Sequence, residues 1–327
     1  MFRCWCNKTS VRKGLRVSGL PLVNTLDCVD CPTRDYSKLV CTAEPSHWGQ
    51  EKLLVSEIKF LTPFYGQSYY VVYAGAAPGT HIPILARMFS TMLFVLVDPA
   101  QSMIRSNEYP NVEVMNAYMT DELARVLADI CGDSILFVSD VRIGSVGGGA
   151  VEADEDQQRR IHRDMLSQQG WLRIMNPVRS MLKFRLPWSL GAVTEYVGGE
   201  ICFPVYGKRL THETRLVVPR GASQKRYDNV LYERQLAYYN QVMRPAAYYT
   251  FGRLGCYDCS SFRLIIRDFL KASGRDCSDG QLLSLECLKI ELELRLLAER
   301  WSRRRPRPAA AHGLLGLAVP QFTKQHA

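Results

Sequence analysis

Apolar residues in the middle of the chain follow two periods in turn, one typical of strands and one typical of helices. Short apolar runs predict strands at residues 69–74 (YYVVYA), 92–98 (MLFVLVD), 111–115 (NVEVM) and 134–140 (SILFVSD). Helical spacing predicts helices at residues 49–60 (GQEKLLVSEIKF), 83–89 (PILARMF) and 120–130 (TDELARVLADI). Strands that alternate with helices predict an α/β fold, in which a mostly parallel central sheet carries helices on both faces.

The second half of the chain continues the pattern less regularly. The glycine- and acid-rich stretch 142–156 predicts a mobile, exposed loop, followed by a helix at about 157–169. Further strands are predicted in VRSMLKFRLPW, GEICFPV and ETRLVV, and further helices in YERQLAYYNQVM and QLLSLECLKIELELRLLAER. Thr120 has the residue type and position of a helix N-cap. We find no internal repeat.

The ends of the chain differ from its middle in composition. Residues 1–34 show no period and predict an irregular arm, and residues 35–300 predict a single domain. Residues 301–327 hold five basic residues and no acid, which is more than half of the net charge of +9, and predict a disordered tail. A basic total favours a polyanionic partner, but this placement makes the argument for nucleic acid weak.

Composition narrows the class of protein. Hydrophobic residues make up 47% of the chain and charged residues 22%, as in soluble globular proteins. No run approaches the ~18 apolar residues of a membrane span, and the first residues lack the apolar core of a signal peptide. We therefore expect an intracellular protein without a membrane partner.

Eleven cysteines raise the question of a metal site. Cys28 and Cys31, like Cys256 and Cys259, have the CxxC spacing of zinc ligands, and the two pairs together could form a four-thiolate site. The pairs lie far apart in the sequence, and neither has the flanking residues of a zinc knuckle. We therefore expect buried free thiols and no metal.

A small-residue turn, Gly75-Ala-Ala-Pro-Gly79, joins a predicted strand to a predicted helix. Backbone at such a turn can approach a ligand closely. Ala77 replaces the second glycine of G-x-G-x-x-G, which argues against a dinucleotide and an NAD-dependent dehydrogenase. Asp98 ends the next strand, where a carboxylate can accept hydrogen bonds from both hydroxyls of an adenosine ribose. A tight turn without a ligand is an equally good interpretation of these residues.

Four charged residues follow in the order Lys52, Asp140, Lys183 and Glu213. Methyl transfer to a ribose 2′-hydroxyl requires a base stronger than aspartate or histidine. A lysine, with an ordinary pKa of about 10.4, can serve if burial and a nearby cation lower that value and carboxylates aim the amine. Taken singly, each residue is more often an exposed position or a loop cap. The four in this order, with the small-residue turn between the first two, form a much more specific pattern.

Five segments together resemble one family. The poxvirus cap-specific mRNA (nucleoside-2′-O-)-methyltransferases, which also serve as the small regulatory subunit of the viral poly(A) polymerase, are similar from about Tyr36 to Tyr249. The similarity lies in GQEKLLVSEIKFL, VVYAGAAPGTHI, ILFVSDVR, NPVRSMLKFRLPW and ETRLVV. The resemblance implies a Rossmann-like methyltransferase fold that uses S-adenosylmethionine, with Lys183 as general base. It also implies that Lys52 helps that amine to lose its proton, and that Asp140 and Glu213 orient it.

The resemblance also implies positions that bind cofactor and cap. The implied cofactor contacts are Gln50, Tyr73, Gly75, Gly79, Asp98, Met119 and Arg142. Ala100 stands where the family has an arginine, so one adenosine contact is lost or replaced. The cationic 7-methylguanine would stack between Trp188 and Tyr36, with Glu233 reading its edge. Leu190 replaces the family's second acid. Phosphate contacts are expected from Arg142, Arg185 and Lys208.

The resemblance implies two partners, capped mRNA and the catalytic subunit of a poly(A) polymerase in a heterodimer. It places the protein in the virion and in the host cell cytoplasm. A non-catalytic RNA-binding polymerase subunit and a cellular rRNA 2′-O-methyltransferase remain alternatives.

Overall fold

The computed structural model describes most of the chain between residues 49 and 304. The described residues are 22, 25–26, 32–35, 49–105, 108–141, 154–187, 191–207, 211–251, 253–275 and 279–304. In this part of the chain, no helix is both long enough and apolar enough to cross a membrane.

A seven-stranded sheet forms the centre of the molecule, with the strand order β3-β2-β1-β4-β5-β8-β7. The strands are β1 (Tyr70–Ala74), β2 (Leu93–Val97), β3 (Val112–Met115), β4 (Ile135–Ser139), β5 (Arg179–Phe184), β7 (Glu200–Cys202) and β8 (Thr214–Pro219). The five strands β1 to β5 pair in parallel, while β8 is antiparallel to β5 and β7 is antiparallel to β8. The order of the five parallel strands is that of a doubly wound, Rossmann-like sheet.

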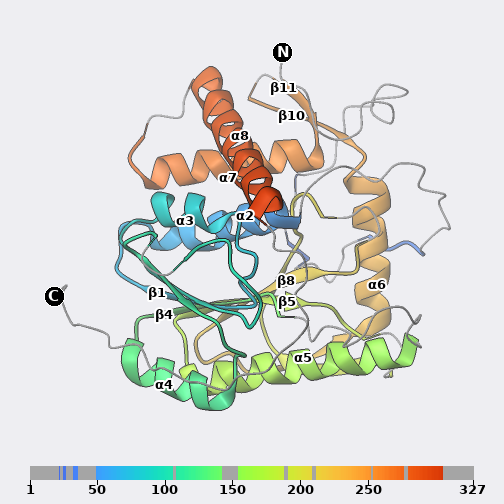
Figure 1. Cartoon of the computed structure of the whole chain (residues 1–327). Helices are drawn as coiled ribbons and strands as arrows, with labels where there is room; N and C mark the ends of the chain where they lie inside the picture. The colour runs from blue at the N-terminus through green and yellow to red at the C-terminus, as the bar shows by residue number, and fades with distance from the viewer. Residues whose placement is uncertain are drawn as a thin grey trace.

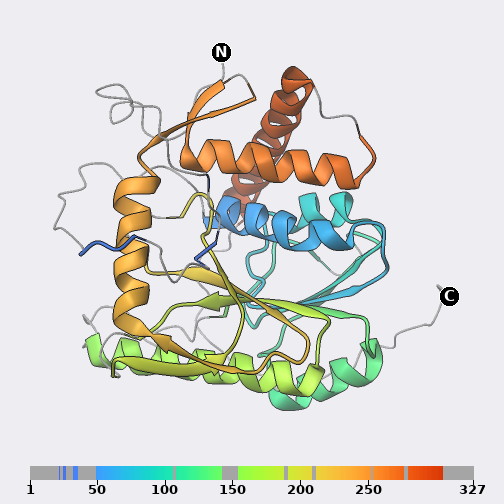
Figure 2. The same cartoon turned by 180° about the vertical axis from the view of Figure 1, so that it is seen from behind.

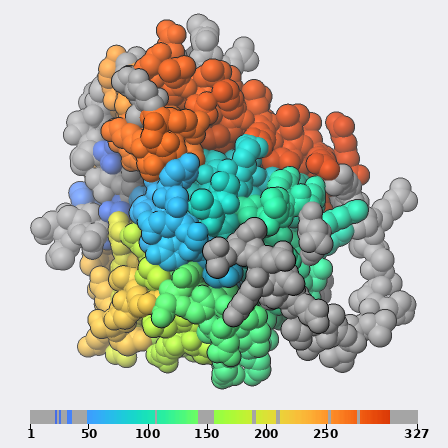
Figure 3. Space-filling model, turned by 90° about the vertical axis from the view of Figure 1, so that its left-hand side faces the viewer, coloured from blue at the N-terminus to red at the C-terminus, as the bar shows by residue number. Residues whose placement is uncertain are grey.

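Helices cover both faces of this sheet (Figures 1 and 2). One face carries α2 (Gly49–Leu61), α3 (Ile82–Met88), α7 (Tyr257–Ala272) and α8 (Gly280–Arg304). The opposite face carries α4 (Asp121–Cys131) and α5 (Asp154–Met175), and α6 (Asn229–Tyr238) stands beside the sheet. Seen from the side, the orange and red surface of α7 and α8 lies above the blue surface of α2 (Figure 3). The α/β fold predicted from the sequence is confirmed.

Short elements complete the structure. A 3-10 helix, η1 (Thr62–Phe64), follows α2, and a π-helical turn, η2 (Tyr239–Met243), extends α6. Two antiparallel pairs lie outside the main sheet: β6 (Val193–Val197) with β9 (Gln224–Asp228), and β10 (Ala247–Thr250) with β11 (Arg253–Cys256).

Alternation along the strands builds a hydrophobic core on each face. In β1, Val71 and Tyr73 join the core beneath α2, α3, α7 and α8, whereas Val72 and Ala74 join the core above α4 and α5. Because successive side chains point to opposite faces, a strand buried on both sides reads as a continuous apolar run. This explains why the runs at β1, β2 and β4 were recognisable as strands.

The predicted boundaries differ from the structure in several places. The hydroxyl of Thr120 accepts a hydrogen bond from the Leu123 amide at 3.2 Å, which confirms the predicted N-cap. Residues 154–156 are helical, so that part of the predicted loop was wrong, and residues 142–153 lie outside the described residues. Helix α8 continues to Arg304, past the boundary drawn at residue 300. The division into arm, domain and tail stays a prediction.

Part of the arm lies along the free edge of β7. Thr25 forms an antiparallel bridge with Cys202, and the Leu26 amide donates to the Ile201 carbonyl at 2.7 Å. These residues therefore act as a short additional strand at that edge.

Cysteine chemistry in the described residues is simple. Cys131, Cys202, Cys256, Cys259 and Cys287 are free thiols there, and no group of three or more metal-ligating side chains comes together in the same part of the chain. Cys28 and Cys31 lie outside the described residues, so the expectation of no metal stays a prediction.

Candidate active site

The turn after β1 packs directly against the end of β4. Gly75 has a φ of +81°, and a Cβ built there would lie 2.8 Å from the backbone carbonyl carbon of Asp140 and from the amide nitrogen of Val141. Glycine is required because a side chain would both strain the backbone and force the two strand ends apart. The Gly75 amide donates to the Val97 carbonyl at 2.9 Å, which ties the turn to β2 as well.

Asp98 lies at the carboxyl end of β2, facing this turn. One carboxylate oxygen accepts a hydrogen bond from the Ala77 amide at 3.0 Å, and the other accepts one from the Ala100 amide at 2.8 Å. Each oxygen keeps a second acceptor position, because a carboxylate offers about four. A half-buried carboxylate held in this way can accept hydrogen bonds from a vicinal diol.

A buried hydrogen-bond chain runs beneath the turn. The Gln50 side-chain oxygen accepts from the Thr80 amide at 3.0 Å and lies 2.8 Å from His81 Nδ1, so this nitrogen carries a proton. His81 Nε2 lies 2.9 Å from one oxygen of Glu57, and the other Glu57 oxygen accepts from the Tyr73 hydroxyl at 2.7 Å. The phenol of Tyr73 is thereby committed to Glu57, and only its backbone is placed to meet a ligand at the turn.

Three strands and one helix bring the predicted K-D-K-E residues together. Lys52 projects from α2, Asp140 follows β4, Lys183 lies in β5 and Glu213 immediately precedes β8. Lys183 Nζ is 2.8 Å from Asp140 Oδ1 and 3.6 Å from Glu213 Oε2, while Lys52 Nζ donates to Glu213 Oε1 at 2.5 Å. The two ammonium groups share one carboxylate.

A fifth charged residue, Arg215, completes this arrangement and was missed in the sequence. Its side chain is 2% exposed, and its guanidinium donates to Asp140 Oδ1 at 2.7 Å and lies 3.2 Å from Glu213 Oε1. The antiparallel pairing of β5 with β8 sets Arg215 opposite Lys183. The sequence did contain a signal for Arg215. Residues two positions apart in an extended segment lie on the same face, and Arg215 follows Glu213 by two positions, so it should lie on the same face as Glu213.

We define the charged cluster as Lys52, Asp140, Lys183, Glu213 and Arg215. It holds three basic groups and two carboxylates. Burial, and then the Arg215 charge, lower the pKa of Lys52, although both carboxylates oppose this. Burial acts to raise the pKa of Asp140, but Arg215 and Lys183 outweigh it, and the pKa is lowered. Three cations against two carboxylates leave one positive charge in excess. Because a guanidinium stays protonated, a lysine is the group in the cluster that can lose a proton and this charge.

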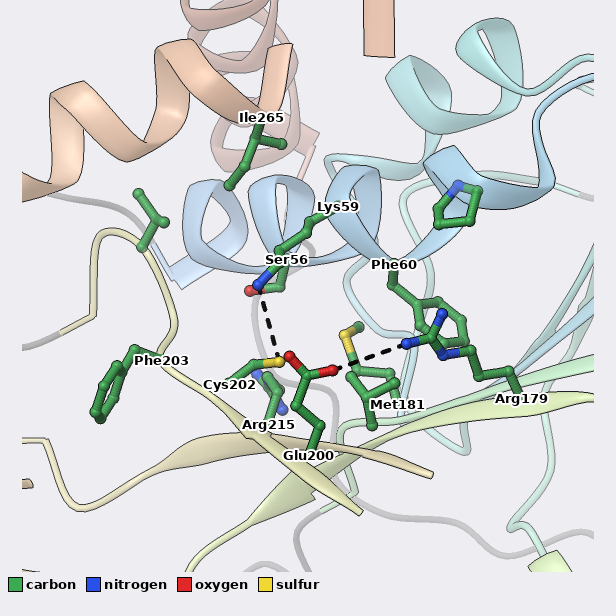
Figure 4. Close-up of a pocket in the computed structure, with 13 residues that line it drawn as sticks. Ser56, Lys59, Phe60, Arg179, Met181, Glu200, Cys202, Phe203, Arg215 and Ile265 are labelled. Atoms are coloured by element: carbon green, nitrogen blue, oxygen red, sulfur yellow. Dashed lines mark hydrogen bonds and ion pairs between the residues drawn. The ribbon is translucent and has the colours of Figure 1, made fainter. Parts of the chain in front are cut away.

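Arg215 also borders a small cavity on its other side (Figure 4). The cavity measures about 150 Å³ and lies between α2 and the strands β5, β7 and β8. Within it, Lys59 Nζ is 3.9 Å from the Cys202 sulfur, and Arg179 pairs with Glu200 at 3.9 Å. Burial raises the pKa of the Cys202 thiol to about 11, which keeps it protonated and unreactive.

The remaining predicted site residues divide into two groups. Met119 is half-buried against the core above α4 and α5, and Glu233 is half-buried on α6. Burial raises the pKa of Glu233, while the positive charge of Arg185 acts in the opposite direction. The residues that fall outside the described part of the chain are Tyr36, Arg142, Trp188, Leu190 and Lys208.

The fold and the site define an α/β protein of the doubly wound class. At the carboxyl edge of its sheet lie the buried charged cluster and the turn 75–79 with the facing Asp98, which we call the cradle. The chain belongs to the poly A polymerase regulatory subunit family, whose family model matches residues 32–271.

Relatives in two poxviruses are similar over most of this region. A Myxoma virus (strain Lausanne) protein described as cap-specific mRNA (nucleoside-2′-O-)-methyltransferase is 25% identical over 225 residues, covering 61% of this chain and 62% of that protein. A Fowlpox virus (strain NVSL) protein of the same description is 23% identical over 217 residues, covering 60% of this chain and 68% of that protein. The chain thus matches less than two thirds of the Myxoma virus relative. A structure of bluetongue virus VP4, described as a multifunctional RNA-capping production line, is 15% identical over 76% of this chain and 38% of its own, with a TM-score of 0.47.

Proposed function

We propose that this protein transfers a methyl group from S-adenosylmethionine to the ribose 2′-hydroxyl of the first transcribed nucleotide of m7G-capped mRNA. The observation that carries the proposal is the charged cluster, in which two lysines share Glu213 beside a permanently charged, buried arginine. The names of the Myxoma virus and Fowlpox virus relatives support the choice of acceptor.

Lys183 is the proposed general base. Its amine lies between Asp140 and Glu213, and these carboxylates fix the direction in which its lone pair points after proton loss. Lys52 contacts the same Glu213 carboxylate, and burial together with the Arg215 charge lowers the pKa of Lys52. Arg215 keeps its charge throughout, so the charged cluster can lose a positive charge only from a lysine. Lys183 would then take the proton of the 2′-hydroxyl while the ribose oxygen forms its bond to the methyl carbon and the bond from that carbon to sulfur breaks.

The cradle beside the cluster fits the proposed cofactor. S-adenosylmethionine supplies an electrophilic methyl group on its sulfonium when bound. Asp98 would hold the ribose diol, and the missing side chain at Gly75 would let the ligand lie against backbone. Gln50, Gly79, Met119 and Arg142 remain proposed contacts, and Tyr73 would contribute through its backbone. The fit rests on the two amides that hold the Asp98 carboxylate.

Cap recognition is proposed for Glu233, together with Tyr36 and Trp188. A carboxylate can accept hydrogen bonds from the edge of 7-methylguanine and attract its positive charge, and two aromatic rings can stack on its faces. The position of Glu233 on α6, next to the charge of Arg185, supports this role.

Labelled methyl transfer to three short RNAs of the same sequence, with an m7G cap, with a cap that lacks the 7-methyl group and without a cap, tests the proposal. We expect transfer to the m7G-capped RNA, and loss of about 10²–10⁴-fold in rate for Lys183→Ala, the range for general-base catalysis. Lys225→Ala, in β9, is the matched control and should keep full activity. Normal methylation by Lys183→Ala would overturn the assignment of the base, and equal transfer to uncapped RNA would favour the rRNA-type alternative.

The family match favours a second function, as the regulatory subunit of a poly(A) polymerase. We propose that the chain binds the catalytic subunit as a heterodimer, in the virion and in the host cell cytoplasm. Lys183→Ala should co-purify with that subunit and stimulate polyadenylation as wild type does. Loss of both properties in this variant would show that the two functions are not separable.

A further inference from the structure

An open groove of about 990 Å³ lies between α5 and the β6 strand, and none of its lining residues belongs to the cradle or to the charged cluster. The wall formed by α5 presents Asp156, Arg159, Arg160, Arg163 and Leu166 along one side, with His162 beside them. Residues spaced by three or four share a face of a helix, so the arginines form a continuous basic stripe. The facing wall consists of Pro187, Val193, Thr194 and Glu195.

The lining suits a ligand with alternating anionic and apolar parts. The lining holds three arginines and two acids, which gives it a net positive charge. Asp156 lies 3.8 Å from Arg159 within the same stripe, and Glu195 lies 3.7 Å from Arg226 on β9, outside the groove. Leu166 and Val193, which are 48% and 41% exposed, add apolar surface between the charges. Guanidinium groups bind phosphates, and apolar side chains with guanidinium planes support unstacked bases.

One wall of the groove begins close to the charged cluster along the chain. This wall starts at Pro187, four residues after Lys183. Four residues of extended chain span at most about 14 Å, so the backbone of Pro187 lies within that distance of the backbone of Lys183. Asn229, at the start of α6, donates to the Pro187 carbonyl at 2.9 Å and accepts from Thr194 at 2.9 Å, which holds this wall in place. Glu233 lies one turn further along the same helix.

We propose that this groove binds the single-stranded body of the capped transcript, through its phosphates on the arginines of α5. The inference rests on the proposed function for its RNA substrate. It predicts that the length of the RNA, and not only its cap, sets the affinity.

The test compares two double variants that remove the same charge. Arg159→Gln/Arg163→Gln alters the groove, and Arg125→Gln/Arg173→Gln removes two exposed arginines of α4 and α5 that do not line it. Binding of a capped 20-mer and of a capped dinucleotide is measured by anisotropy over a salt series. We expect the groove variant to bind the 20-mer about tenfold more weakly, with a salt slope smaller by roughly 1.4, and to bind the dinucleotide as wild type does.

Several outcomes would overturn the inference. They are unchanged 20-mer binding by the groove variant, an equal loss in the control variant, or a lower melting temperature that accounts for the loss. Loss of the polymerase catalytic subunit with intact RNA binding would instead identify a protein interface and also refute the inference. Binding is measured without methyl transfer, so the two proposals can fail separately. A wild-type protein that shows this dependence on RNA length but no methylation would refute the proposed function and still support RNA binding by the groove.

Discussion

Arg215 offers the sharpest test of how the charged cluster works, through the substitution Arg215→Met. The methionine fills a similar apolar length but removes the hydrogen bond to Asp140 at 2.7 Å and the contact with Glu213 at 3.2 Å. Removing one partner of a buried ion pair costs about 3–5 kcal/mol. Here two lysines remain to balance two carboxylates, so we expect a loss near the lower limit, about 3 kcal/mol.

The same substitution should change the pH dependence of methyl transfer. Arg215 is the second largest cause of the lowered pKa of Lys52, after burial. Without the guanidinium, the two ammonium groups alone balance Asp140 and Glu213, so loss of the Lys52 proton requires a higher pH. We therefore expect the pH–rate profile to move to alkaline pH, with activity lost at neutral pH and partly restored at high pH.

Urea unfolding and single-turnover methylation across a pH series measure these two effects. The control is Arg220→Met, because Arg220 follows the same strand and pairs with the exposed Asp133 at 3.2 Å. A surface pair of this kind contributes under about 1 kcal/mol. The proposed role of Arg215 is refuted if the free energy of unfolding of Arg215→Met lies within about 1 kcal/mol of that of the control, or if its pH–rate profile matches that of wild type.

Three further predictions concern the turn, the cap site and a helix end. Gly75→Ala should abolish S-adenosylmethionine binding in calorimetry, because its Cβ would lie 2.8 Å from backbone atoms. The control Gly221→Ala has a φ of +72° but open space around it, so it should lose only about 1–2 kcal/mol of stability to backbone strain and bind the cofactor normally. Because the pKa of Glu233 is raised, affinity for a cap analogue should fall on acidification at a higher pH than it would with an ordinary carboxylate. Glu233→Gln should remove this pH dependence, and an unchanged pH profile in the variant would exclude Glu233 as a cap-binding residue. Thr120→Ala should lower the free energy of unfolding by about 1 kcal/mol, and no change would show that its hydrogen bond to Leu123 contributes nothing net.

The apolar runs made the parallel half of the fold predictable, whereas the rest depended on tertiary pairing. β1, β2 and β4 are buried on both faces, so their sequences are continuously hydrophobic. β9 (QKRYD) is largely exposed and polar, and it exists because it pairs with β6. Helix α7 was not predicted from the sequence. It buries the polar residues Asp258, Ser260, Ser261 and Arg263, which interrupt the helical spacing of its apolar residues.

The candidate site was predictable only in part, for a related reason. Lys52, Asp140, Lys183 and Glu213 could be proposed because a known family carries the same residues in the same order. Arg215 could not, because its importance follows from the register that places it opposite Lys183 and from complete burial. The commitment of the Tyr73 phenol to Glu57 was equally invisible, since it depends on how α2 packs on β1. Pairing register and packing are properties of the folded chain.

The two residues that lie along β7 affect how the protein can be shortened for experiments. An edge strand with unpaired amides and carbonyls is a template for another chain, and the Leu26 amide already occupies the Ile201 carbonyl there. A deletion that ends before Thr25 keeps this pairing along β7. A deletion that extends through Leu26 leaves backbone groups at the edge of the sheet unpaired, and such a truncated protein should self-associate during purification.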